Sequence, residues 1–178
     1  FHGVQYNDKK VEKGTGELML MSNFPSFLNG DSTPEQVRDY FKSISKNEKV
    51  KKPQFHAVIS AKYQNHSKEE LTEIAKDFMQ EMGYGKQPFI VVYHSDTENN
   101  HVHIVSTRVD KQTGKKINDS YERLKAQKAL ADLLEKRYGI SSEEKLEKLL
   151  NYQFNTITQL ELLLERSGFK LTKDTNDE

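Results

Sequence analysis

Three short segments of the chain are dominated by β-branched and aromatic residues, at 55–61, 89–94 and 101–109. Such residues fit a pleated, partly buried surface, so each segment is predicted to be a β-strand. The first is apolar at nearly every position, which favours a place at the centre of a sheet. The second and third flank a short polar loop and are therefore expected to pair as a hairpin.

Three longer segments place apolar residues at helical spacing behind a polar residue that would cap a helix. Thr33 is followed by Pro34, and Gln36 comes three residues after Thr33, which is typical of a capping box with proline at the first helical position. Ser67 and Asp119 take the same place in the other two, each with Glu three residues later. Helices are therefore predicted at 33–47, 67–83 and 119–139.

The two ends of the chain are less regular. Residues 1–7 are expected to form a short strand or extended segment that ends at Tyr6. Because the chain begins with Phe rather than Met, further residues are expected before it. Two more helices are predicted near 142–150 and 157–167. The chain is therefore divided into a domain at 1–140 and a helical C-terminal extension at 141–178.

The order of these elements indicates the fold class. Strands alternate with helices, yet one connection is a hairpin, which is typical of an α+β fold. We expect an antiparallel or mixed central sheet with helices on one face. The other face is expected to be open, where a long polymer could lie.

Composition narrows the class of protein. The 178 residues are 34% hydrophobic and 30% charged, which fits one folded domain. The chain has no cysteine, which excludes disulfides, thiolate catalysis and cysteine-based zinc sites. We see no apolar run long enough to span a membrane and no signal-like segment, so a cytoplasmic protein is expected.

The formal net charge is zero, from 27 basic and 27 acidic residues. This balance argues against a protein dominated by nucleic-acid electrostatics. Lysines nevertheless cluster at 49–52 and 111–116, where they form either solvated loops or contacts to phosphates.

The densest group of chemically active side chains is at 94–103, which holds three of the six histidines. His101 and His103 alternate with Val102 along a strand and therefore share a face. His94 ends the facing strand and joins them if the register allows, since opposed Cβ atoms are about 5 Å apart. One histidine on a strand is usually packed or solvated, but three that converge predict a facial metal site with open positions.

The ligands alone do not identify the ion. Neutral imidazole suits Mn, Ni, Zn, Cu and Co, whereas Mg prefers oxygen ligands. Asp96 is either an ordinary loop residue or a carboxylate that accepts the outer N–H of a ligating imidazole. Three neutral ligands leave the ion its full charge, which favours an anion such as a phosphodiester oxygen.

Chemistry at a phosphodiester requires a nucleophile. A tyrosine suits a reversible step, because the phosphotyrosyl ester conserves the bond and returns it to a hydroxyl. The chain has eight tyrosines, and position leaves Tyr6 and Tyr121 as equal candidates, the latter in the first turn of the long helix. Deprotonating a tyrosine of pKa about 10 requires the metal or a base, for which Asp8, Glu12 and His56 are candidates.

The motif His94-x-Asp96 followed by His101-Val-His103, and then by Arg108, resembles the relaxase or mobilisation nuclease family of HUH single-strand endonucleases. The segments 55–57, 82–85 and 119–121 are similar as well. The resemblance covers roughly residues 1–140. It implies a nucleophile ahead of the histidine motif, which selects Tyr6. Rolling-circle replication initiators place theirs on a later helix.

The resemblance implies a metal-dependent enzyme that nicks one DNA strand at the transfer origin of a bacterial plasmid or mobile element. The enzyme would stay joined to the 5′ phosphate through Tyr6 and later religate the strand. His94, His101 and His103 would hold a divalent ion, with Mg or Mn expected first and Zn, Ni or Co also suitable. Partners would be single-stranded origin DNA and accessory mobilisation and coupling proteins, with no membrane.

Two groups of residues are added from their positions alone. His56 would either face the catalytic patch and orient Tyr6 or the phosphate, or be a hydrogen-bonded core residue. Contacts to DNA phosphates are predicted for Lys49, Lys51, Lys52, Arg108, Arg123 and Lys125.

Three other functions stay open on the sequence, one of them a small metallohydrolase that would release its product rather than become attached to it. A replication initiator would use Tyr121 as its nucleophile. A binding module would recognise an origin hairpin and hold the metal only for structure, without cleaving DNA.

Overall fold

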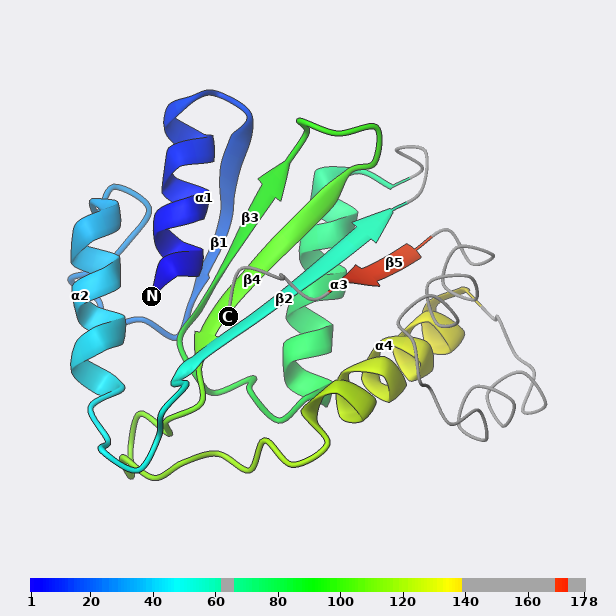
Figure 1. The fold of residues 1–178 in the computed structure, drawn as a ribbon. Coiled ribbons are helices and arrows are strands. Elements are labelled where there is room, and N and C mark those ends of the chain that lie inside the picture. Colours follow the sequence, from blue (N-terminus) through cyan, green and yellow to red (C-terminus); the bar gives the residue numbers. More distant parts are fainter. Residues whose placement is uncertain (62–65, 139–168, 173–178) are drawn as a thin grey trace.

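The computed structural model describes residues 1–61, 66–138 and 169–172. At its centre is a five-stranded sheet in the order β1-β3-β4-β2-β5, with every neighbouring pair antiparallel (Figure 1). The strands are β1 (Gly16–Ser22), β2 (Gln54–Ala61), β3 (Phe89–His94), β4 (His101–Thr107) and β5 (Phe169–Thr172). The predicted α+β class, the hairpin of β3 and β4 and the place of β2 inside the sheet are confirmed.

Side chains alternate along each strand, so the sheet contributes to two apolar layers. One layer contains Val91, Val102 and Ile104, packed against α3 (Lys68–Glu81) and α4 (Glu122–Tyr138). Figure 1 shows α3 behind the sheet. β3 and β4 are buried along almost their whole length, which explains their near-continuous apolar sequence.

Two of the three predicted helix starts are confirmed, whereas α4 begins at Glu122 rather than directly after the predicted cap Asp119. Thr33 Oγ1 accepts a hydrogen bond from the Gln36 N–H at 3.3 Å, and Gln36 Oε1 accepts one from the Thr33 N–H at 2.8 Å, so the capping box of α2 (Pro34–Ile44) is complete. Ser67 Oγ accepts from the Glu70 N–H at 3.1 Å at the start of α3. These local signals depend on neighbours in sequence, which is why the sequence alone located them.

The N-terminal segment is a helix, α1 (His2–Glu12), and the prediction of an extended segment at 1–7 was wrong. Val4 on α1 and Phe41 on α2 pack against Val92 and Val105, which form the second apolar layer of the sheet. The second face of the sheet therefore carries α1 and α2 beside β1 and β3, and is less open than expected (Figure 1).

A buried polar residue explains the wrong prediction for α1. Asn7 is fully buried, and its Nδ2 donates to the carbonyl of Gly3, one turn earlier, at 2.8 Å. A polar residue thus occupies the inner side of the helix, where the usual apolar pattern would have an aliphatic side chain.

The C-terminal extension is described only at β5, which pairs with β2. The helices predicted near 142–150 and 157–167 lie outside the described residues. No helix in the described part of the chain has the length and apolar character to cross a membrane.

Candidate metal centre

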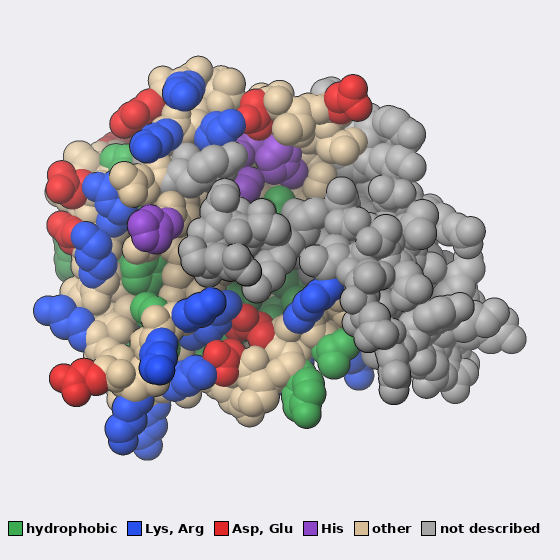
Figure 2. All heavy atoms as spheres, in the orientation of Figure 1, with side chains coloured by type: hydrophobic (Ala, Val, Ile, Leu, Met, Phe, Trp, Pro, Cys, Tyr) green, Lys and Arg blue, Asp and Glu red, His purple; other side chains and the backbone are tan. Residues whose placement is uncertain are grey.

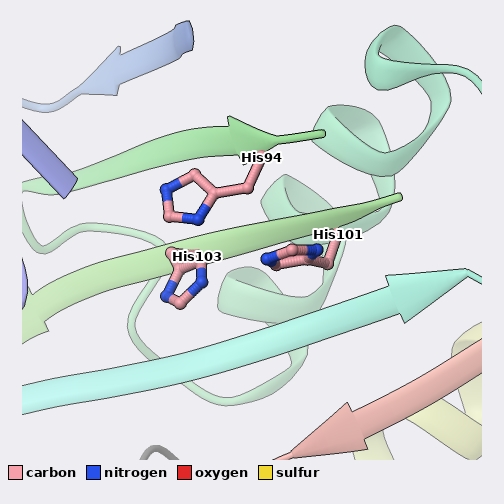
Figure 3. A group of neighbouring side chains, drawn as sticks. All are labelled: His94, His101 and His103. Carbon is pink, nitrogen blue, oxygen red and sulfur yellow. The ribbon is translucent and has the colours of Figure 1, made fainter. Parts of the chain in front are cut away.

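The pairing of β3 with β4 places the three motif histidines together. His94 lies directly opposite His101, and His103 lies opposite Val92 on the same face of the sheet. Figure 3 shows the three rings gathered over this face, one from β3 and two from β4. Ring centroids are 5.2 Å apart for His94 and His101, 4.2 Å for His94 and His103, and 5.3 Å for His101 and His103. The predicted register is therefore confirmed.

The donor atoms of this histidine triad fit one cation. A ring nitrogen from each of His94, His101 and His103 lies within 4.8 Å of the other two. Metal–nitrogen bonds of about 2.1 Å place neighbouring ligand atoms roughly 3 to 4 Å apart, so small ring movements would bring all three onto one ion. The triad is thus a site that could bind a metal ion.

The protonation of the triad also suits a metal. Burial, helped by the charge of His101, lowers the pKa of His94 from 6.5 to about 4. Burial, with the charges of His94, His56 and His101, lowers the pKa of His103 to about 2. Both imidazoles are therefore neutral at physiological pH and keep a lone pair for coordination.

Hydrogen bonds on the outer nitrogens orient two of the rings. His101 Nδ1 lies 3.0 Å from the carbonyl oxygen of Asn99, which only accepts, so the neutral ring carries its proton on Nδ1 and its lone pair on Nε2. His103 Nδ1 lies 2.9 Å from His56 Nε2. Such outer bonds fix the tautomer and the direction of a metal ligand.

His56 is therefore the fourth histidine of the site. It lies on β2, opposite Val105, and is half-buried. If His103 coordinates through Nε2, its Nδ1–H must donate to His56 Nε2, and His56 then carries its own proton on Nδ1. The sequence singled out His56, but only the pairing of β2 with β4 connects it to His103.

Asp96 lies in the loop between β3 and β4, which we call the histidine loop, and its contact with Lys10 connects this loop to α1. Lys10 Nζ donates to Asp96 Oδ2, and their side chains are 25% and 20% exposed. Burial alone would raise the pKa of Asp96, but the hydrogen bond and charge of Lys10 outweigh it and lower that pKa. Lys10 could not be predicted from the sequence, because its position relative to the loop depends on α1 being a helix.

The two candidate tyrosines lie on different elements. Tyr6 belongs to α1, one turn after Gly3 and one turn before Lys10. Tyr121 precedes α4, beside Glu122, which binds Arg108 just beyond the end of β4. At about 3.4 Å per residue, Arg108 lies about 17 Å along the chain from His103. Tyr121 therefore lies near the end of β4 that is farther from the triad.

The predicted phosphate contacts differ in their surroundings. Lys49, Lys51, Lys52, Arg123 and Lys125 are exposed. The guanidinium of Arg108 instead donates to Glu122 at 2.7 Å, to the carbonyl of Lys52 at 3.2 Å and to the carbonyl of Gln54. These bonds give Arg108 a structural role, so it is not proposed as a DNA contact.

Comparison with known families now adds to this geometry. A family model described as relaxase, MobA/VirD2-like, nuclease domain, matches residues 6–140. The chain belongs to this family. No curated protein and no solved structure matches it. The match starts at Tyr6 and covers the triad and the four strands β1 to β4, so this relaxase domain has a DNA-nicking role and binds DNA.

Proposed function

We propose that this relaxase domain nicks one strand of DNA at a transfer origin by transesterification, with Tyr6 as the nucleophile. The observation that carries the proposal is the convergence of three imidazoles, two of them held neutral by burial, on one face of the sheet. A cluster of this kind leaves coordination positions open on the side away from the strands, where a phosphodiester oxygen fits.

The proposed step conserves the phosphodiester bond energy. The phenol oxygen of Tyr6 forms a bond to phosphorus while the bond from phosphorus to the 3′ oxygen breaks. The phenol proton is lost, and the leaving 3′ oxygen gains a proton and becomes a hydroxyl. The 5′ phosphate stays on Tyr6, and the reverse reaction restores the strand. This reversibility suits mobilisation of a plasmid or mobile element.

Residues of the chain hold the reacting groups. His94, His101 and His103 would bind a divalent ion, which supplies positive charge to a phosphate oxygen as negative charge develops there. His56 holds the ring of His103 in one direction. The ion pair of Lys10 with Asp96 joins α1, the helix that contains Tyr6, to the loop between β3 and β4.

The native ion stays a prediction. Family resemblance favours Mg²⁺ or Mn²⁺, while three imidazoles favour Mn²⁺, Zn²⁺, Ni²⁺ or Co²⁺ over Mg²⁺. Accessory mobilisation and coupling proteins also stay predictions.

The test is formation of a covalent adduct. The protein is incubated with labelled single-stranded oligonucleotides that tile an origin region, with each metal in turn, and separated on a denaturing gel. We expect a shifted protein band with Mn²⁺ or Mg²⁺, none with chelator, and none for Tyr6→Phe. Tyr121→Phe serves as the matched control and should keep the adduct.

Each alternative function has its own result. An adduct that survives Tyr6→Phe and disappears in Tyr121→Phe would favour the hypothesis of a replication initiator. Tight binding without any adduct under all metals would favour a binding module.

A further inference from the structure

Two segments meet at the end of the sheet opposite the triad. Asn47 Nδ2 donates to the carbonyl of Gly114 at 2.7 Å, and Arg108 joins the carbonyl of Lys52 to Glu122. The segments 46–52 and 111–125 therefore form one continuous surface, which we call the basic end.

The basic end is strongly charged although the chain is neutral overall. Its two segments contain nine basic and three acidic residues, in a chain with 27 of each. Figure 2 shows Lys and Arg side chains gathered at the bottom of the view, with a group of His side chains near the top. The eight exposed basic residues are Lys46, Lys49, Lys51, Lys52, Lys115, Lys116, Arg123 and Lys125.

An exposed aromatic side chain lies within this charge. Tyr121 is 77% exposed and has a φ of 55°, a left-handed conformation that residues with a Cβ rarely adopt. Leu124, three residues later, is 48% exposed. Neither the fold nor the proposed catalytic site uses the ring of Tyr121. Strained backbone that displays a side chain to solvent is found most often at functional positions.

We propose that the basic end binds single-stranded DNA several nucleotides from the scissile phosphate, with lysines on phosphates and Tyr121 stacked on an unpaired base. Lysine clusters with an accessible aromatic ring are the usual means of binding single strands. The separation of about 17 Å from the triad lets both sites contact one strand at once. The inference rests on the proposed function only in taking DNA as the substrate.

Binding is measured without cleavage, so that failure of the nicking chemistry does not affect the result. Fluorescence anisotropy of labelled oligo(dT) of about 20 nucleotides is followed against salt concentration in chelator. Each phosphate contact to a single strand contributes about 0.7 to the slope of log affinity against log salt. The triple variant Lys49→Gln, Lys51→Gln, Lys52→Gln should lower that slope by up to about 2.

The matched control removes the same charge elsewhere, by Lys42→Gln, Lys76→Gln and Lys136→Gln on α2, α3 and the end of α4. This variant should keep most of the slope. Equal losses in both triple variants would contradict the proposal, because they would mean that only net charge matters.

Tyr121 is tested by three substitutions. Tyr121→Ser should weaken binding by roughly 5- to 150-fold, and Tyr121→Phe should bind as the parent does, because stacking needs the ring and not the hydroxyl. Tyr121→Gly should also weaken binding while keeping or raising the Tm, because glycine adopts a positive φ without strain. Equal affinities for Ser and Phe, or stronger binding of duplex than of single strands, would overturn the proposal.

Discussion

His56 lies outside the candidate triad but contacts one of its rings. Its Nε2 lies 2.9 Å from His103 Nδ1 and fixes the direction in which the ring presents its other nitrogen. His56→Phe removes that acceptor and should weaken Mn²⁺ binding by about 10- to 100-fold, as measured by isothermal titration calorimetry. His2→Phe, on the exposed side of α1, is the control and should leave the affinity unchanged. Equal affinities in the two variants would remove His56 from the site.

The lowered pKa values of His94 and His103 make the metal-free protein sensitive to acid. Because both folded-state values lie below 6.5, the unfolded chain binds more protons as the pH falls. Their stabilising contribution is complete above pH 6.5 and is lost as the pH falls toward about 4 for His94 and about 2 for His103.

Between pH 7.5 and 5 we expect a loss of about 2 kcal/mol in unfolding free energy for each of these two imidazoles. Urea denaturation in chelator measures it. His94→Asn removes one of the two imidazoles and should therefore reduce the total loss of unfolding free energy by about 2 kcal/mol. A stability that is flat over this range would show that the two rings are not held neutral by burial.

The sequence predicted the candidate ligands but not all of the residues that orient them. His94, His101 and His103 were found because strand alternation and one hairpin register bring them together. Asn99 and Lys10 were missed, because a backbone carbonyl and the far end of a helix leave no local pattern.

Among the elements, α1 is the one whose placement most affects the proposed chemistry. Its contact to the histidine loop is the ion pair of Lys10 with Asp96. The pair is partly exposed, so its loss should cost under about 1 kcal/mol of stability. Catalysis is more sensitive to position, since a small displacement of a reacting group can lower the rate by roughly 100-fold.

Lys10→Gln should therefore lower the rate of adduct formation by roughly 10- to 100-fold with little change in Tm. Single-turnover nicking and thermal unfolding are measured on the same samples. Lys9→Gln, an exposed neighbour on the same helix, provides the comparison. Similar rates for the two variants would argue that α1 is held by its apolar contacts alone.

The helices and strands that the sequence predicted are those whose patterns come from residues close together in the chain. The helices α2 and α3 follow from capping residues and helical spacing, and β2, β3 and β4 from apolar runs. α1 was mistaken for an extended segment because Asn7 is buried through a bond to its own helix. β5 was not foreseen, because its pairing with β2 joins segments more than 100 residues apart.

An ionic network of Arg108, Glu122 and Tyr84, largely shielded from solvent, connects the end of β4 to α4. Arg108 and Glu122 have side chains only 16% and 19% exposed, and the Tyr84 hydroxyl also donates to Glu122 at 2.8 Å. Removing the carboxylate charge leaves the guanidinium without its counter-ion, which is strongly destabilising for buried pairs.

Glu122→Gln should lower the unfolding free energy by about 2 kcal/mol, less than for a fully buried pair because some solvent reaches this one. Asp119→Asn, which removes a more exposed partner of Lys116, should cost under about 1 kcal/mol. Urea midpoints give both values. A larger effect at Asp119 would mean that the network is not what fixes α4.

Gly3 determines how close α1 can come to the sheet. Its N–H donates to Gln54 Oε1 at 3.0 Å, and a Cβ atom there would lie 3.2 Å from both Gln54 Nε2 and Val105 Cγ2. Val105 belongs to β4, the strand that carries His103, so a methyl group at position 3 would move α1, which carries Tyr6, away from that strand by a few tenths of an ångström. The single hydrogen at this position thus sets how closely the helix of the proposed nucleophile approaches the strand of the candidate ligands, and Gly3→Ala, which adds one carbon and two hydrogens, would alter the proposed reaction before it altered the fold.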